Sequence, residues 1–387
     1  MPAGALHSPA DTHSNYPDIS QVMENRLARH IASYLALIPL FVLGGCSLGG
    51  DRHPQAAMAA DEPRMVELFY VTDRAPDADG DEYFSGIRGD LSYGVAEINI
   101  PPGHVMGEHE EASLLKLEWE NEAGKHIKLH DVLTLNSNTF TARLGRAIEA
   151  SPGNKVMVFV HGYNEPFPET SKRVAQFSDD LKFTGPVILF TWPSQGSLTG
   201  YVTDETNAEW AESHFIETLT MLLEQVPAHS IYLVGHSMGN RIIGNAMVTL
   251  SGDRLESDLI RFREIIMIAP DIDADVFRRE MAPRLARTGI HISLYASSRD
   301  RALMASKAFH GYPRAGDSGE SLVIVDGMET IDASETSGGL LGHSYYAEDR
   351  RIMEDIYGLL QTGQRADDRF GLQAMETAQG RYWTFRK

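Results

Sequence analysis

Beyond residue 150, short apolar runs alternate with longer segments in which apolar residues recur every three or four positions. Short continuous apolar runs predict buried strands, and the longer spacing predicts helices packed on a sheet. The predicted strands cover 156–160, 187–191, 231–234, 265–269, 290–296 and 322–325, and the predicted helices cover 169–182, 205–225, 238–250, 273–286, 301–309 and 344–361. This alternation predicts βαβ units, and therefore an α/β fold with a mostly parallel central sheet and helices on both faces.

Further strands are predicted upstream of this region. Residues 66–71 and 93–100 are rich in β-branched and aromatic side chains, and 114–119 and 127–135 are two further strand candidates. With the first two strands opening the sheet, the segment 231–234 is the fifth strand along the chain.

The segment 231–234 ends abruptly in Gly235-His236-Ser237-Met238-Gly239, which has the pattern G-x-S-x-G. A serine on a sharp strand-to-helix turn holds its Oγ clear of the sheet, and the two glycines let the backbone pass closely. The short pattern alone also fits a plain tight turn. The predicted strand before it and the helix after it favour a nucleophile elbow with Ser237 as the nucleophile.

A serine nucleophile needs a histidine that takes its proton and a carboxylate that orients the histidine. In proteins with this kind of nucleophile elbow, the order along the chain is serine, acid, histidine. His343 lies beyond the last predicted strand, in a glycine-rich loop before a helix, and is the expected base, with His310 as the fallback.

The acid has two candidate positions. Asp300 follows the predicted strand 290–296, whereas Asp271 and Asp273 follow the preceding strand. Asp300 is favoured, and the other two remain alternatives. Each of the three could instead cap the helix that follows it.

Nucleophilic attack on a carbonyl also needs N–H groups aimed at the developing oxyanion. We expect one from the backbone of Met238, directly after the nucleophile. The other is expected from the backbone of Tyr163, in the loop His161-Gly162-Tyr163-Asn164 after the strand 156–160. His161 is expected to brace this loop rather than to react.

Five segments together resemble the bacterial α/β-hydrolase family DUF900, part of which is described as esterases. They are Phe69-Tyr70-Val71-Thr72-Asp73-Arg74, Val158-Phe159-Val160-His161-Gly162-Tyr163-Asn164, Thr191-Trp192-Pro193-Ser194, the elbow through Arg241, and 294–303. The resemblance implies an α/β-hydrolase fold and a Ser-His-Asp triad, but no substrate. A small carboxylic ester is the expected substrate. Hydrolysis of an amide, thioester or lactone, or a non-catalytic docking role in the cell envelope, are the alternatives.

The N-terminal part is expected to be a leader. Arg26 and Arg29 precede an apolar stretch at 31–43, which is too short to span a bilayer, and Leu43-Gly44-Gly45-Cys46 resembles a lipobox. We therefore expect a lipid on Cys46 that anchors the protein to a bacterial membrane, most simply the outer membrane facing the periplasm. An ordinary cleaved leader or a buried helix are the alternatives, and Met23 could be the true start.

This assignment divides the chain into a leader (1–46), a flexible tether (47–62), the hydrolase domain (63–363) and a C-terminal extension (364–387) to which the sequence assigns no role. The formal net charge is −20, from 54 acidic and 34 basic residues, and disfavours binding to nucleic acid. Cys46 is the single cysteine, so no intrachain disulfide is expected. We found no phosphate loop, nucleotide fingerprint or metal-ligand spacing in the sequence, so we expect no cofactor.

Overall fold

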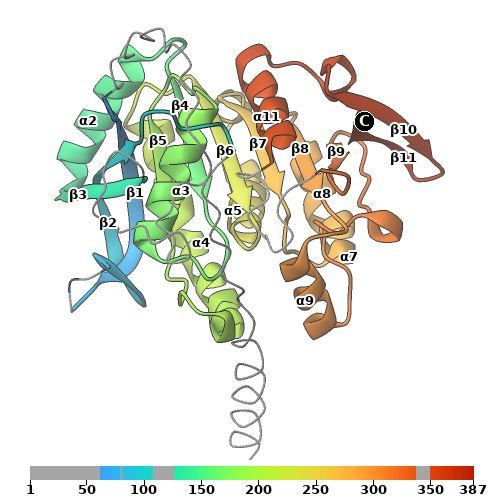
Figure 1. Ribbon diagram of the computed structural model, residues 1–387, viewed down its shortest axis with the longest axis horizontal. Coiled ribbons are helices and arrows are strands. Elements are labelled where there is room, and N and C mark those ends of the chain that lie inside the picture. Colours follow the sequence, from blue (N-terminus) through green and yellow to red (C-terminus); the bar gives the residue numbers. More distant parts are fainter. Residues whose placement is uncertain (1–61, 79, 81, 108–125, 337–348) are drawn as a thin grey trace, which may run out of the picture. The chain divides into compact units, whose positions relative to one another are not determined.

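The computed structural model describes residues 62–78, 80, 82–107, 126–336 and 349–387. These residues belong to one compact unit, Met58–Lys387. Its centre is a sheet of 11 strands in the order β10-β11-β9-β8-β7-β6-β4-β5-β1-β2-β3 (Figure 1). The strands are β1 (Arg64–Pro76), β2 (Phe84–Ile100), β3 (Lys128–Leu135), β4 (Lys155–Val160), β5 (Val187–Thr191), β6 (Ser230–His236), β7 (Phe262–Ile268), β8 (His291–Ala296), β9 (Glu329–Asp332), β10 (Leu372–Thr377) and β11 (Gly380–Phe385).

The interior of the sheet is parallel, and both edges are antiparallel. Every neighbouring pair from β1 through β5, β4, β6, β7, β8 and β9 to β11 runs parallel. The pairs β1–β2, β2–β3 and β10–β11 are antiparallel. Because parallel strands end at the same edge, the residues that follow β6, β7 and β8 share one edge of the sheet.

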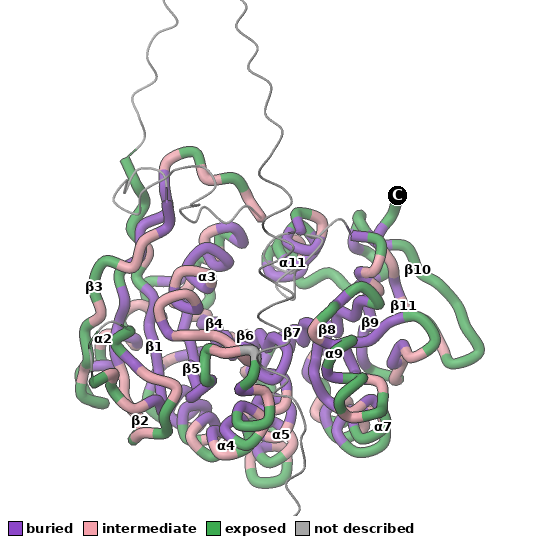
Figure 2. The backbone as a smooth tube through the Cα atoms, turned by 60° about the horizontal axis from the view of Figure 1, so that its bottom comes forward, coloured by how far each residue is buried: buried purple, intermediate pink, exposed green. Residues whose placement is uncertain are grey.

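Helices cover both faces, as the alternating pattern predicted. One apolar cluster packs α2, α4, α5 and α8 on one face, and a second packs α3 and α11 on the other. The central strands β4 to β8, between these two layers, are almost entirely buried (Figure 2). The helices are α2 (Ser137–Ala150), α3 (Phe167–Asp180), α4 (Tyr201–Glu224), α5 (Gly239–Asp253), α6 (Glu256–Leu259), α7 (Ala274–Val276), α8 (Ala282–Ala286), α9 (Arg301–His310) and α11 (Arg350–Thr362), with a π turn (Phe277–Met281) between α7 and α8.

Two sequence-based expectations about strands were wrong. Residues 322–325 form no strand, because they precede a turn at Gly327 (φ 85°), and the strand of this region is β9, which follows that turn. Residues 127–135 contribute β3, so the elbow follows the sixth strand of the chain rather than the fifth. The apolar side chains of Leu322 and Val323 are nevertheless buried, and for this reason the run resembled a core strand.

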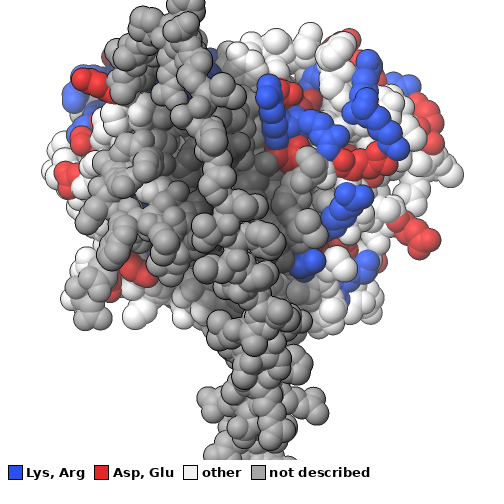
Figure 3. Space-filling view, in the orientation of Figure 1, with Lys and Arg blue, Asp and Glu red and all other residues white. Residues whose placement is uncertain are grey.

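The C-terminal extension is part of the sheet. Residues after 363 form the hairpin β10–β11, and β11 pairs with β9. In Figure 3, Lys and Arg side chains gather over α11 and this hairpin, where Arg351, Arg369, Arg386 and Lys387 line a surface depression.

The expected leader, Cys46, the strand candidate 114–119 and His343 lie outside the described residues, as does the expected tether except Glu62. Within the described residues, we found no helix of the length and apolar character needed to cross a membrane.

Candidate active site

Ser237 lies at a strained turn between β6 and α5. Its φ is 52°, in the left-handed region that non-glycine residues rarely adopt, and the residue is only 1% exposed. Strain of this kind persists only where the surrounding structure imposes it. The turn therefore has the backbone geometry that a nucleophile elbow requires.

Close packing explains why the elbow has a glycine at position 239. A Cβ at Gly239 would lie 2.3 Å from Val160 O and 2.5 Å from His161 O, at the end of β4. No side chain tolerates such approaches to backbone atoms. Gly239 thus allows the start of α5 to lie against the strand that leads into the expected oxyanion loop.

Hydrogen bonds hold the elbow in its strained form. Ser237 N–H donates to Ile268 O at 3.0 Å, and Asp271 N–H donates to Ser237 O at 3.2 Å. The side-chain amide of Asn240 donates to the same two carbonyls, Ser237 O at 3.3 Å and Ile268 O at 3.0 Å. Asn240 is therefore a clamp on the elbow. In the sequence, the only indication of this role was that Asn240 lies in one of the five segments that carry the family resemblance.

The expected oxyanion loop lies directly beside the nucleophile. A Cβ at Gly162 would be 2.8 Å from Ser237 Cβ, so the glycine lies directly against the Ser237 side chain. Tyr163, next in the chain, is half-buried, and its ring packs edge-on against Tyr201 at 5.3 Å. Met238 is fully buried at the start of α5. Gly162 and Ser237 are thus in contact. Tyr163 and Met238, which are expected to provide the oxyanion N–H groups, directly follow them in the chain.

His161 braces this loop. It is buried and stacks on Trp192 with ring centroids 5.0 Å apart. Its Nε2 accepts the Trp192 N–H at 3.1 Å, and its Nδ1 faces Gly162 O at 2.7 Å, which assigns the proton to Nδ1. Burial, followed by the nearby Arg74 guanidinium, holds the pKa of His161 well below its ordinary value. A buried neutral histidine with both nitrogens engaged is suited to structure rather than to proton transfer.

Two buried charged residues that the sequence did not single out as site residues position the same loop. The Arg74 guanidinium donates to Glu165 O at 2.5 Å and to Ser194 O at 3.0 Å. The Asp204 carboxylate accepts Asn164 N–H at 3.2 Å and also bonds to Ser194 Oγ at 2.6 Å. Arg74 and Asp204 therefore tie the oxyanion loop to the segment that follows β5.

Of the three candidate acids, Asp271 has its carboxylate filled by other groups. Its oxygens accept from Tyr201 Oη at 2.5 Å, Ser306 Oγ at 2.7 Å and Arg314 Nε at 2.7 Å, with Arg241 at 3.5 Å. Burial by itself would raise the pKa of Asp271, but the two arginines and these hydrogen bonds bring it below its ordinary value. This arrangement suits a permanent counter-ion better than a partner for a histidine.

Asp273 and Asp300 both cap helices. Asp273 accepts the N–H groups of Asp275 and Val276 at the start of α7. Asp300 is 1% exposed, and its Oδ1 accepts Leu303 N–H at 3.0 Å at the start of α9. Asp300 follows β8, at the sheet edge where the Ser237 turn follows β6.

The fallback base is engaged elsewhere. His310 Nδ1 faces Ser306 O at 2.9 Å, and its Nε2 faces Glu205 Oε1 at 3.0 Å. Since both ring nitrogens face acceptors, neither is placed to take a proton from a serine.

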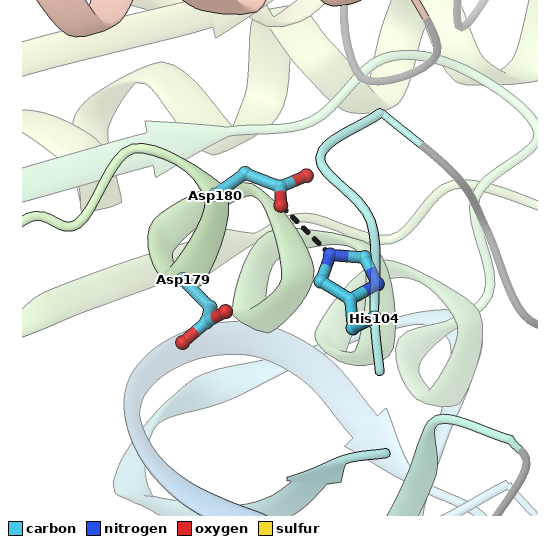
Figure 4. Close-up of side chains that lie close together, drawn as sticks. All are labelled: His104, Asp179 and Asp180. Carbon is cyan, nitrogen blue, oxygen red and sulfur yellow. Dashed lines mark hydrogen bonds and ion pairs between the residues drawn. The ribbon is translucent and has the colours of Figure 1, made fainter. Parts of the chain in front are cut away.

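A cluster of His104, Asp179 and Asp180 has ligand atoms within 4.8 Å of one another, but it already carries its own cations. Asp180 points at His104, with Oδ1 2.7 Å from Nε2 (Figure 4). Asp179 pairs with Arg64 at 2.5 Å and with Lys182 at 3.1 Å. The cluster is therefore an ion-pair network that fastens the segment after β2 to the end of α3.

Residues 136–361, more than half of the chain, match the family described as "Alpha/beta hydrolase of unknown function (DUF900)". No curated protein matches the chain.

Several solved structures are similar to this chain. One comes from a structural analysis of two fungal esterases from Rhizomucor miehei. It has 12% sequence identity to this chain, 92% of both chains is covered, and the TM-score is 0.32. Another is the LpqC poly(3-hydroxybutyrate) depolymerase from Bordetella parapertussis, with 12% identity, 79% of this chain and 92% of that chain covered, and a TM-score of 0.34. A third is the carboxylesterase CesB from Bacillus subtilis, with 10% identity, 56% and 86% covered, and a TM-score of 0.33.

Proposed function

The chain belongs to the α/β-hydrolase family DUF900, and from this premise we propose that it is a serine hydrolase that cleaves carboxylic esters through an acyl-enzyme. The observation that carries the proposal is the strained Ser237, with φ 52°, against which Gly162 of the loop after β4 packs. A fold gains nothing in stability from holding a serine in this conformation.

In the proposed mechanism, Ser237 Oγ attacks the ester carbonyl carbon while His343 accepts its proton. The carbonyl oxygen becomes an oxyanion and accepts hydrogen bonds from the backbone N–H groups of Met238 and Tyr163. The C–O bond then breaks, and the alcohol leaves with the proton from His343. Water, activated by the same histidine, hydrolyses the acyl-enzyme and regenerates Ser237.

We assign the acid role to Asp300 rather than to Asp271. The Asp271 carboxylate is committed to Arg314, Tyr201 and Ser306. Asp300 instead follows the second strand beyond the nucleophile strand in the sheet. From there it would hold His343 in the required tautomer.

The test is labelling of the full chain with a fluorophosphonate probe, combined with hydrolysis of p-nitrophenyl esters. Ser237→Ala and His343→Ala should each lose labelling and turnover. The exposed residues Ser213 and His229 provide matched controls, since Ser213→Ala and His229→Ala should behave as the wild type. A folded wild-type protein that neither labels nor turns over any ester would reject the proposal in favour of a docking role.

Membrane attachment is a separate proposal that rests on the lipobox-like segment before Cys46. Metabolic labelling with a clickable fatty acid in a bacterial host should mark the wild type and leave Cys46→Ser unmarked. Equal labelling of both proteins would exclude Cys46 as the lipid attachment site.

A further inference from the structure

His291 lies between two largely buried glutamates. Its Nδ1 is hydrogen-bonded to Glu264 Oε2, and its Nε2 lies 2.9 Å from Glu329 Oε2. Glu264 belongs to β7, whereas His291 and Glu329 are the first residues of β8 and β9. None of the three side chains is more than 11% exposed. We call these three residues the Glu–His–Glu cluster.

The sheet register brings the cluster together, away from the candidate active site. Glu264 and His291 are directly paired in the register of β7 with β8, and β9 begins beside them at Glu329. Since side chains alternate between the two faces of a strand, the cluster shares its face with Ile266 and Ile331, which belong to the apolar layer of α3 and α11. It lies toward the amino ends of these parallel strands, whereas the Ser237 turn follows the carboxyl end of β6.

The two contacts of His291 require two protons. A neutral imidazole carries one N–H, so it can face only one carboxylate without placing a nitrogen lone pair against an oxygen. The second contact needs a further proton, either on the ring or on one of the carboxyl groups. At pH 7 an unfolded histidine is mostly neutral and an unfolded glutamate is ionised. The folded cluster therefore holds one proton that the same groups in the unfolded chain do not hold.

The hydrogen bonds of Glu329 place this proton on Glu264 and His291. Glu329 Oε2 accepts from Arg369 Nη2 at 2.7 Å, and its Oε1 accepts from Ala366 N–H at 2.9 Å. Burial raises the pKa of Glu329, but both of these donors oppose the rise. Burial raises the pKa of Glu264 to about 8, against the lowering influence of Arg369. Glu264 and His291 therefore share the additional proton.

The shared proton can exchange with solvent, because His291 lines a surface depression of about 330 Å³. The other ionisable groups around the cluster are Tyr232 of β6, Glu256 of α6, Arg263 of β7, Asp355 of α11, and Arg365 and Asp367 between α11 and β10. The carboxylates among them outnumber the arginines. These groups therefore do not compensate for ionisation of both glutamates of the cluster.

Glu329 connects the cluster to the C-terminal hairpin. Its carboxylate binds Ala366 and Arg369, which lie between α11 and β10, and β9 pairs with β11. Strands β9, β11 and β10 form one edge of the sheet, whereas β7 and β8 are interior strands (Figure 1). When the shared proton is lost, a neutral ring remains between two ionised glutamates and can donate to only one of them. The edge elements, which have fewer neighbouring strands, should detach before the interior ones.

We infer that one shared proton in the Glu–His–Glu cluster holds β9 and the C-terminal hairpin on the sheet, and that loss of this proton in mildly alkaline solution loosens them. The inference does not depend on the proposed hydrolase activity. The folded cluster keeps the proton up to about pH 8, whereas an unfolded histidine releases its proton near pH 6.5. The free energy of unfolding should therefore fall as the pH rises from about 6.5, and level off above about pH 8.

The first experiment measures urea unfolding of the full chain between pH 6.5 and 9. In the comparison variant, Glu264→Gln/His291→Gln, neither position titrates. Over this range the unfolding equilibrium constant of the wild type should rise about tenfold more than that of the double variant. Glu212→Gln is the matched control, because this half-buried glutamate accepts from Asn245 rather than contacting a histidine, and it should behave as the wild type. Equal pH dependence in the wild type and the double variant would overturn the inference.

The second experiment localises the effect and needs only the wild type, so it remains decisive if the double variant does not fold. Limited proteolysis is compared at pH 7 and pH 9, with a protease whose rate on an unstructured peptide is measured at each pH. Cleavage within 363–387 should accelerate by up to about tenfold at pH 9, in proportion to the open population. Unchanged cleavage there, or equal acceleration within 62–100, would show that the proton does not hold the hairpin and would overturn the inference.

Discussion

Gly162 and Ser237 lie so close together that a Cβ on the glycine would stand 2.8 Å from Ser237 Cβ. The same Cβ would be 3.0 Å from His236 Nδ1. The backbone of the expected oxyanion loop therefore packs against the side chains of Ser237 and His236. Their relative position depends on position 162 having no side chain.

We expect Gly162→Ala to lower kcat/KM for p-nitrophenyl esters by about 100-fold, because a shift of the loop or of the serine by a fraction of an ångström spoils a reacting geometry. Gly252→Ala is the matched control, since a Cβ there meets no atom within 4 Å. Thermal unfolding measured beside the kinetics separates misplacement from misfolding. Unchanged kinetics in Gly162→Ala would mean that this loop does not serve the reaction.

The strain at Ser237 predicts a difference between two inactive variants. A left-handed φ costs an alanine roughly 1–2 kcal/mol, and glycine avoids this cost but loses roughly 0.5–1 kcal/mol of chain entropy. Ser237→Gly should therefore be more stable than Ser237→Ala by about 0.5–1 kcal/mol in urea unfolding.

At Ser213, in the interior of α4, the same pair should reverse its order, with the glycine variant less stable by about 1 kcal/mol. If Ser237→Gly were the less stable of its pair, the strained conformation would not be the one in solution.

The elbow could be predicted from the sequence because its signal is local. Strand, glycine, serine and helix follow one another within about twenty residues, and each constrains the next. Arg74 and Asp204 could not be predicted as part of the site, because their partners lie far away along the chain. Arg74 bonds to Glu165 O, 91 residues later, and to Ser194 O, 120 residues later. Only the closed sheet brings these atoms together.

Arg74→Met should damage both folding and catalysis. It removes the guanidinium hydrogen bonds to Glu165 O and Ser194 O, at a cost of about 1–3 kcal/mol for each. We expect kcat to fall more than KM rises, because the loop that carries the Tyr163 N–H loses its support. Ester kinetics well below the unfolding temperature test this expectation. Arg143→Met, which breaks a surface pair with Glu67, should leave both parameters near the wild-type values.

The lowered pKa of Asp271 predicts that the stability of the protein depends on pH. Since the pKa of Asp271 is lower in the folded state than in the unfolded state, its contribution is present above the unfolded value of about 4 and is lost as the pH falls through the folded value. Asp271→Asn should therefore destabilise the protein by about 3–5 kcal/mol at pH 7, because Arg314 is left buried without its counter-ion.

The difference in unfolding free energy between the wild type and Asp271→Asn should shrink below about pH 4, because the wild type loses the same ion pair there. Urea unfolding at several pH values measures it. The folded Asp271→Asn protein should still label with fluorophosphonate, whereas Asp300→Asn should label slowly. The opposite result would make Asp271 the triad acid.

The C-terminal hairpin shows where sequence patterns carried too little information. In β10, Leu372 is buried, but the other five residues are exposed, so the strand lacks the alternation of a half-buried strand. Arg369, just before β10, pairs with carboxylates of α11 and β9, and β11 itself pairs with β9. Such a pairing leaves no periodic trace.

Arg369 donates to Asp355 at 2.8 Å and to Glu329 at 2.7 Å, and all three side chains are largely buried. Arg369→Met should lower the free energy of unfolding by about 3–5 kcal/mol, because two carboxylates stay buried without their cation. Arg381→Met, in the exposed pairs of the same hairpin, should change it little.

Limited proteolysis provides the local readout for Arg369. If Arg369 docks the hairpin, cleavage after residue 363 should accelerate in Arg369→Met and stay slow in Arg381→Met. A global loss of stability without faster cleavage there would mean that Arg369 supports the sheet through β9 and α11 alone. In that case β10 and β11 would be held by their pairing with β9.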